Sequence, residues 1–224
     1  MFIFNVENLN DIALIENNDS VITYSDLYQQ VRDFSSFFDY RHLVFIIGEN
    51  DVATIVCYLS AVESGMGPLL LGTKINQNQI NNLINIYKPK YIFQKLDSNP
   101  YRGFNLASKY QRYSLFLRDK HEDIKLHPNL ALLLTTSGST GSPKLVRLTK
   151  KNLISNAKSI SKYLKITSND RAITSLPFNY SYGLSVINSH LISGGSIVLS
   201  NSSMMEGDFW RLISKHSVTS LAGV

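Results

Sequence analysis

The stretch that most constrains this chain is residues 131–153, in which an apolar run leads into a loop of glycine and hydroxyl residues. Gly138 and Gly141 allow backbone angles that other residues rarely adopt, so the loop can curl around a ligand. The serines and threonines beside them supply hydroxyls and unhindered amide groups suited to an anion. Lys144 adds a positive charge where the loop ends. This composition is typical of a loop that binds phosphate.

The order of the residues excludes two other kinds of phosphate loop. The P-loop of NTPases needs a second glycine where this chain has Pro143. The dinucleotide fingerprint needs Gly-x-Gly-x-x-Gly, but Ser139 and Thr140 separate the two glycines. Residues 145–148 predict a short strand, and Thr149 is the expected N-cap of an amphipathic helix. We therefore predict a strand, a glycine-rich loop, a second strand and a helix.

The motif Thr-Ser-Gly-Ser-Thr-Gly-Ser-Pro-Lys at 136–144 resembles the phosphate loop of the adenylate-forming (AMP-binding) enzymes. This family includes acyl-CoA synthetases, adenylation domains of nonribosomal peptide synthetases, and luciferases. Thr149, Asn152 and Leu153 fit its usual continuation, although Lys150 stands where the family commonly has histidine. Weaker similarities follow the family's order at 23–27, 63–68 and 176–183. The resemblance places the chain in the front part of the large N-terminal domain.

The resemblance implies that the loop surrounds the β and γ phosphates of ATP. The expected ATP phosphate-binding residues are Thr136, Ser137, Gly138, Ser139, Thr140, Gly141, Ser142 and Lys144. The two glycines would act as hinges, and the lysine would pair with the phosphate charge. The glycine content also predicts weak order when ATP is absent. The competing interpretation is an ordinary surface turn, in which the same residue types are common.

The resemblance also implies a reaction in which ATP and a small-molecule carboxylic acid give an acyl-adenylate and pyrophosphate. The implied cofactors are ATP/AMP with Mg²⁺, and the implied acceptor is coenzyme A or a carrier-protein phosphopantetheine. Phe178, Tyr180 and Gly183 occupy the stretch where the family lines its acyl pocket. Tyr180 could equally be a core aromatic. No complete catalytic set is expected here, and fatty, aromatic and amino acids all remain open as substrates.

Alternating strand and helix patterns predict an α/β fold, with helices on both faces of a mostly parallel sheet. Ser25, Asp51 and Asn76 are the expected N-caps of three helices, and Gly65 is expected to end the second. Residues 217–224 predict a strand with no cap or turn after it. We therefore interpret residues 1–224 as one incomplete domain, without the family's C-terminal remainder and mobile lid domain.

Composition favours a globular intracellular enzyme. Of the 224 residues, 44% are hydrophobic and 17% are charged, which excludes a disordered or fibrous chain. No apolar run is long enough to cross a bilayer, and the first residues lack the features of a signal peptide. We expect a cytoplasmic protein with no membrane span. The single cysteine, Cys57, lies in an apolar run and is expected to be buried and inert.

Positive charge is concentrated around the loop. No acidic residue lies between Asp123 and Asp170, an interval rich in lysine, so an anionic ligand is favoured. No nucleic-acid partner is expected, because no RNA- or DNA-binding motif occurs. The five histidines lack metal-ligand spacing, so no metal site is expected. Trp210 is expected in the core beside Phe209.

Two functional hypotheses follow. The first is an adenylate-forming ligase of which this chain is a fragment that cannot complete catalysis. The second is a non-catalytic partial domain that acts as a binding or interaction module. An exposed apolar edge would suit both, and it could also allow self-association.

Overall fold

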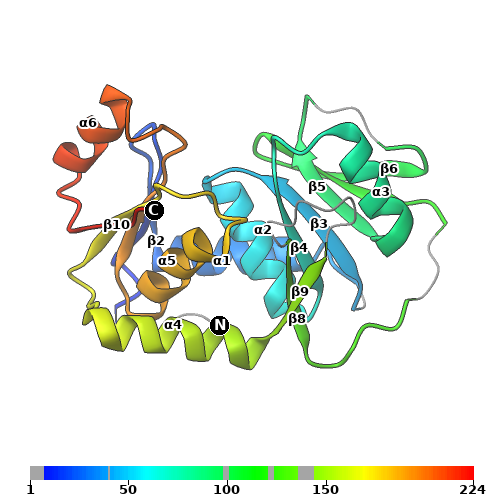
Figure 1. The fold of residues 1–224 in the computed structure, drawn as a ribbon, viewed down its shortest axis with the longest axis horizontal. Helices are drawn as coiled ribbons and strands as arrows, with labels where there is room; N and C mark the ends of the chain where they lie inside the picture. The colour runs from blue at the N-terminus through cyan, green and yellow to red at the C-terminus, as the bar shows by residue number, and fades with distance from the viewer. Residues whose placement is uncertain (1–7, 40, 98–100, 121–123, 136–143) are drawn as a thin grey trace. The chain divides into compact units, whose positions relative to one another are not determined.

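The computed structural model describes residues 8–39, 41–97, 101–120, 124–135 and 144–224. The chain divides into two compact units, each with its own β-sheet and helices (Figure 1). Unit 1 contains residues 1–31, 49–52 and 151–224, and unit 2 contains residues 32–48 and 53–150. The α/β class is confirmed, although the strands form two sheets. The assignment of the whole chain to one domain stays a prediction.

The sheet of unit 2 has a parallel centre with antiparallel strands at both edges. Its strands, in order across the sheet, are β6 (Phe104–Tyr110), β7 (Tyr113–Arg118), β5 (Tyr91–Lys95), β3 (Leu43–Gly48), β4 (Gly67–Gly72), β8 (Leu130–Thr135) and β9 (Leu145–Thr149). The pairs within β5-β3-β4-β8 are parallel, and the other pairs are antiparallel. The parallel strands are almost continuously apolar and buried, as is typical of strands covered on both faces.

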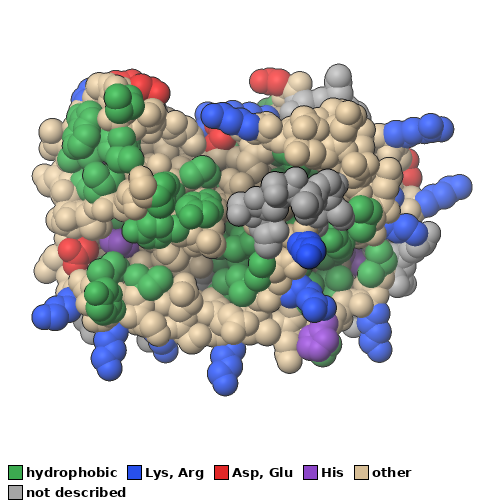
Figure 2. All heavy atoms as spheres, viewed as in Figure 1, with side chains coloured by type: hydrophobic (Ala, Val, Ile, Leu, Met, Phe, Trp, Pro, Cys, Tyr) green, Lys and Arg blue, Asp and Glu red, His purple; other side chains and the backbone are tan. Residues whose placement is uncertain are grey.

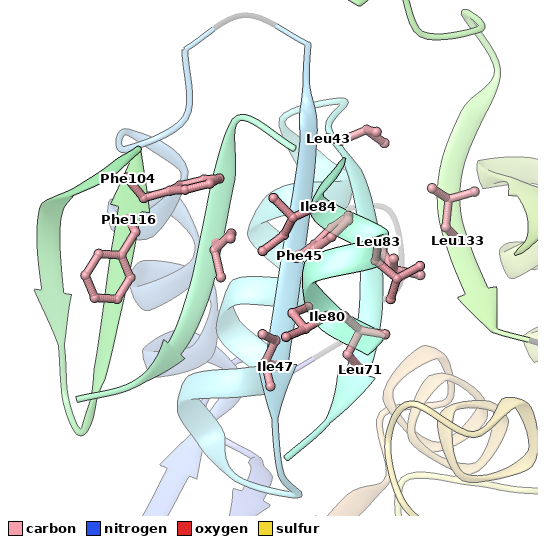
Figure 3. Close-up of a cluster of buried hydrophobic side chains, with 12 residues drawn as sticks. Leu43, Phe45, Ile47, Leu71, Ile80, Leu83, Ile84, Phe104, Phe116 and Leu133 are labelled. Carbon is pink, nitrogen blue, oxygen red and sulfur yellow. The ribbon is translucent and has the colours of Figure 1, made fainter. Parts of the chain in front are cut away.

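Two helices supply much of the remaining core of unit 2. Helix α2 (Val52–Glu63) is apolar around its whole circumference and almost entirely buried. Helix α3 (Gln77–Tyr87) is amphipathic; it buries Ile80, Leu83 and Ile84, while Tyr87 is partly buried. Figure 3 shows these three side chains together with those of the sheet in one apolar cluster.

The sheet of unit 1 has the order β12 (Ser220–Leu221), β10 (Arg171–Ile173), β11 (Ser196–Val198), β1 (Ile12–Ile15) and β2 (Val21–Thr23). All its pairs are parallel except β1 with β2. The helices that lie wholly or mainly in this unit are α1 (Tyr24–Ser35), α4 (Lys150–Leu164), α5 (Ser181–Ile192) and α6 (Gly207–Lys215). Buried side chains from β1, β10, β11 and α6 form its apolar core.

The helix termini test three of the predicted caps. Asn76 caps α3 as expected, because its Oδ1 accepts from the Gln79 amide at 2.9 Å. Gly65 has a φ of +73° just beyond α2, as expected of a residue that ends a helix. Asp51 directly precedes α2, and its role as an N-cap stays a prediction.

The prediction that Ser25 caps the first helix is wrong. Helix α1 begins at Tyr24, and Thr23 Oγ1 accepts from the Asp26 amide at 3.1 Å. The Asp26 carboxylate accepts in return from the Thr23 amide at 2.9 Å. This reciprocal pair is a capping box, which requires an acceptor side chain three residues after the cap. Ser25 has Tyr28 at that position, so it cannot form the box.

Both Trp210 and Cys57 were expected to be buried, and the structure confirms this for Cys57 only. The side chain of Trp210 is 51% exposed, so the prediction of a core tryptophan is wrong. Adjacent helix residues point in directions about 100° apart, and here Phe209 takes the core side. Trp210 Nε1 donates to Met204 O at 2.8 Å. Cys57 is fully buried as expected, and burial raises the pKa of its thiol.

Candidate functional site

The glycine-rich motif connects two paired strands of unit 2. Strands β8 and β9 are antiparallel, and Thr135 pairs with Leu145. The residues on either side of the motif are therefore neighbours in the sheet. Helix α4 follows β9 directly, which confirms the predicted strands on either side of the motif and the helix after them. Residues 136–143 lie outside the described part of the chain. The predicted roles and weak order of Thr136, Ser137, Gly138, Ser139, Thr140, Gly141 and Ser142 therefore stay predictions.

The strands that carry the motif differ in their surroundings. Residues 131–134 of β8 are buried, and β8 pairs in parallel with β4 through Leu69 with Leu133. Strand β9 lies at the edge of the sheet and is partly exposed. Lys144 directly precedes β9 and is exposed to solvent. The motif therefore begins at a strand fixed in the core and ends at a cation that solvent reaches.

Helix α4 carries the basic residues that follow the motif. Leu153 and Ala157 are buried, while Lys151, Lys158 and Lys162 are exposed. Lysine and arginine side chains project along the side of the molecule where α4 runs (Figure 2). These lysines therefore form a solvated face of α4.

Lys150 is the residue at which the motif's continuation departs from the family pattern. Its Nζ lies 3.5 Å from Glu63 Oε2, at the end of α2. Both side chains are more than a third exposed, so we expect this ion pair to contribute at most about 1 kcal/mol. The pair gives Lys150 a structural role at the start of α4.

A second group of polar residues lies at the carboxyl ends of the parallel strands of unit 1. Residues 174–176 follow β10, and residues 199–201 follow β11. Asn50 lies between these segments and is only 7% exposed. Ligands of open α/β sheets typically bind beyond the carboxyl ends of the strands. This edge is therefore the candidate binding region of unit 1.

The three predicted acyl-pocket residues follow the same edge. Phe178 is buried, and its amide donates to Asn50 Oδ1 at 2.9 Å. Tyr180 is the N-cap residue of α5 and is 46% exposed, which excludes the core-aromatic interpretation. Gly183 is buried in the first turn of α5. Whether these residues line a pocket stays a prediction.

Gly183 allows a close approach between α5 and the segment before it. A Cβ at this position would lie 2.3 Å from Pro177 O and 2.9 Å from Leu176 O. Such distances are too short for any side chain, so only glycine lets the helix begin here. The backbone from Leu176 to α5 is therefore tightly packed.

Asn50 was not recognisable from the sequence as a site residue. It lies between a buried strand and a helix, where only Asp51 stood out as an expected N-cap. Its partners Leu176 and Ser200 are more than a hundred residues further along the chain. No local pattern reports such long-range hydrogen bonds, so the sequence contains no signal for this role.

His190 is a buried titratable residue of the same unit. Burial lowers the pKa of its imidazole, whereas the hydrogen bond with Val186 O and the charge of Asp170 oppose this shift. Nδ1 lies 2.9 Å from Val186 O, and Nε2 lies 3.0 Å from Ser220 Oγ. The neutral ring satisfies both contacts by donating from Nδ1 and accepting at Nε2. This geometry is that of a histidine with a structural role.

Within the described residues, no group of three His, Cys, Asp or Glu side chains is placed to hold a metal ion. Among the helices in that part of the chain, none combines the length and apolar character needed to span a membrane.

The fold and the motif agree with the comparison to known families. The chain belongs to the AMP-binding enzyme family, whose model matches residues 5–224. The 2-succinylbenzoate–CoA ligase of Staphylococcus epidermidis is 28% identical over 201 residues, which are 86% of this chain and 40% of that enzyme. The D-alanine–D-alanyl carrier protein ligase of Listeria monocytogenes is 23% identical over 207 residues, again 86% of this chain and 40% of that enzyme.

A solved structure shows the same fold. O-succinylbenzoate coenzyme A synthetase (MenE) of Bacillus subtilis, in complex with AMP, superposes with a TM-score of 0.79 at 21% identity. The match covers 96% of this chain and 58% of that chain. The same enzyme in complex with ATP and magnesium ion gives a TM-score of 0.75. The chain spans about 40% of the length of the curated relatives it matches.

Proposed function

We propose that this chain is the front part of an AMP-forming acid–thiol ligase. The whole enzyme would activate a carboxylic acid with ATP to an acyl-adenylate and pyrophosphate, and would then transfer the acyl group to a thiol. The observation that carries the proposal is the Thr136–Lys144 motif, which connects paired strands in a chain of the AMP-binding family. The two relatives support the reaction class, since one is named a 2-succinylbenzoate–CoA ligase and the other a D-alanine–D-alanyl carrier protein ligase.

The motif has the chemistry that a triphosphate requires. Hydroxyl and amide donors would come from Thr136, Ser137, Ser139, Thr140 and Ser142. Gly138 and Gly141 would let the backbone approach the phosphates closely. Lys144 is exposed beside the end of the motif, where its ammonium group can neutralise the β and γ phosphates. These groups would stabilise the charge that develops on pyrophosphate as it leaves, and Mg²⁺ would neutralise part of the remainder.

The acid and the acceptor belong to the same proposal. Tyr180 is exposed at the carboxyl edge of the unit 1 sheet, beside Phe178 and Gly183, and would contact the acid. Coenzyme A or a carrier-protein phosphopantetheine would accept the acyl group, in agreement with the two kinds of relative. We place the enzyme in the cytoplasm, where these acceptors occur.

ATP–pyrophosphate exchange tests the proposal, using the longest polypeptide that the gene encodes and a panel of carboxylic acids. We expect acid-dependent exchange that Lys144→Ala reduces by about 100-fold, because a charge partner of the departing pyrophosphate is lost. Lys158→Ala is the matched control, since this lysine lies on the solvated face of α4. The proposal is rejected if none of the acids in the panel supports exchange. Equal exchange by the two variants would remove Lys144 from the mechanism.

We also propose that the 224-residue chain alone does not complete catalysis, because it spans only about 40% of its relatives. The same exchange assay on this chain is the comparison. Acid-dependent exchange at the rate of the longer polypeptide would contradict this part of the proposal.

A further inference from the structure

We propose that Asn50 is a positioning residue, which fixes the Leu176–Phe178 backbone and thereby the exposed Tyr180 for acid binding. The inference rests on the proposed function, since it assigns Asn50 a role in the same acid site. Asn50 touches no reacting group in this proposal. It acts only through the segment that leads into α5.

The side chain of Asn50 joins two segments that are distant in the sequence. Its Oδ1 accepts from the Phe178 amide at 2.9 Å. Its Nδ2 donates to Leu176 O at 3.2 Å and to Ser200 O at 3.0 Å. One carboxamide therefore uses its oxygen and both of its N–H groups, and it holds the segments after β10 and β11 together.

The backbone of Asn50 strengthens this connection. Its amide donates to Asn201 Oδ1 at 2.9 Å, and its carbonyl accepts from Asn201 Nδ2 at 3.3 Å. Asn50 is nearly inaccessible to solvent, so water cannot easily replace a lost partner. Buried polar groups that lose a hydrogen bond are costly, which makes this geometry strongly preferred.

The positions of Phe178 and Tyr180 are linked by backbone contacts. The Tyr180 amide donates to Pro177 O at 3.0 Å, and Tyr180 O accepts from the Leu184 amide at 2.9 Å in the first turn of α5. Gly183 packs against the carbonyl of Pro177, so the segment cannot shift alone. Fixing Leu176 and Phe178 therefore fixes the backbone of Tyr180, whose side chain remains accessible to a ligand.

Two substitutions separate the functions of the carboxamide. Asn50→Ala removes the acceptor of the Phe178 amide and both donors. Asn50→Asp keeps the shape and the acceptor, but it places a carboxylate oxygen beside two carbonyl oxygens, which is repulsive. We expect both variants to release the carbonyl groups of Leu176 and Ser200, and Asn50→Ala alone to expose the Phe178 amide.

Tyr24→Phe provides a matched control in the same unit. The Tyr24 hydroxyl is buried and donates to Gly195 O at 2.7 Å. Its loss removes a buried hydrogen bond that involves neither residues 176–178 nor residues 200–201. The control therefore reports the effect of general destabilisation of unit 1.

Amide hydrogen exchange of the 224-residue chain is the first test, at denaturant concentrations that match the global stability of the variants. We expect the Phe178 amide to exchange about 10-fold faster in Asn50→Ala than in Tyr24→Phe, because its acceptor is missing. Equal protection of Phe178 in the two variants would overturn the proposal.

The second test uses ATP–pyrophosphate exchange by the longest polypeptide of the gene. We expect Asn50→Ala and Asn50→Asp to raise the KM for the acid about 10-fold and to change the KM for ATP less than about two-fold. Tyr24→Phe should change neither value. A KM for the acid that equals that of the control would overturn the positioning role. If the wild type shows no exchange at all, the proposed function fails, and hydrogen exchange still decides whether Asn50 fixes the segment.

Discussion

Gly183 shows at the scale of one residue how the segment before α5 is constrained. We expect Gly183→Ala to lower the free energy of unfolding by about 1–3 kcal/mol, because the new methyl group would overlap the Pro177 carbonyl. Gly207→Ala is the control, since a Cβ there meets nothing within 4 Å. Urea unfolding of both variants measures the difference. Equal losses in the two variants would contradict the close approach.

His190 makes a pH-dependent contribution to stability. Its folded-state pKa is lowered from the ordinary 6.5, chiefly by burial, so the unfolded state binds the proton more readily. The contribution of His190 to stability should therefore be greatest above pH 6.5 and should fall as the pH decreases through that value. We expect His190→Gln to weaken this dependence between about pH 7.5 and about pH 5.5, a window in which carboxylates do not titrate. Urea unfolding across this pH range measures the dependence. An equal slope of the free energy of unfolding against pH in the wild type and His190→Gln would contradict the role of His190.

At the scale of an element, the capping box of α3 makes a local contribution that can be isolated. Asn76→Ala should lower the free energy of unfolding by about 1 kcal/mol, because the Gln79 amide loses its acceptor. Asn82→Ala makes the same chemical change at an exposed position inside the helix. We expect this variant to be more stable than the wild type by about 0.5 kcal/mol, because alanine favours the helix. Thermal or urea unfolding compares them, and a larger loss for Asn82→Ala would contradict the cap.

The elements also show which parts of the fold the sequence could predict. Strands β3, β4 and β8 are almost continuously apolar, as is typical of strands buried on both faces, so their sequences carry a recognisable pattern. Strands β1 and β2 are short, and β6 exposes most of its residues, so none of the three has a strong apolar pattern in the sequence. Their positions depend on pairing with β11 and β7, which is a property of the folded sheet.

Some residues of the candidate site could be identified from the sequence, and others could not. Nine consecutive residues identified the motif, and the surrounding apolar and alternating patterns predicted β8 and β9 correctly. Asn50 could not be found, because its partners lie far away in the sequence. Trp210 was misplaced, because an apolar pair on a helix does not show which member faces the core.

At the scale of the whole molecule, the α/β class follows from alternating strand and helix patterns, but the distribution of strands between sheets does not. Parallel strands of both sheets have similar apolar sequences, and the chain passes between the units more than once. Membership of the AMP-binding family rests on residues in both units, since the family match covers 5–224. In the proposed function, the motif of unit 2 binds the phosphates, and the carboxyl edge of the unit 1 sheet binds the acid.

The most direct test of the central claim is a titration of the ¹⁵N-labelled 224-residue chain followed by NMR. Mg·ATP and Mg·pyrophosphate should shift the amide resonances of Gly138 and Gly141, because the motif is proposed to bind the β and γ phosphates. AMP should leave these resonances in place, since it lacks both phosphates, and the amides of Gly103 and Gly207 should not respond to any of the three. The account is contradicted if Mg·ATP leaves the two motif glycines unchanged, or if AMP shifts them equally.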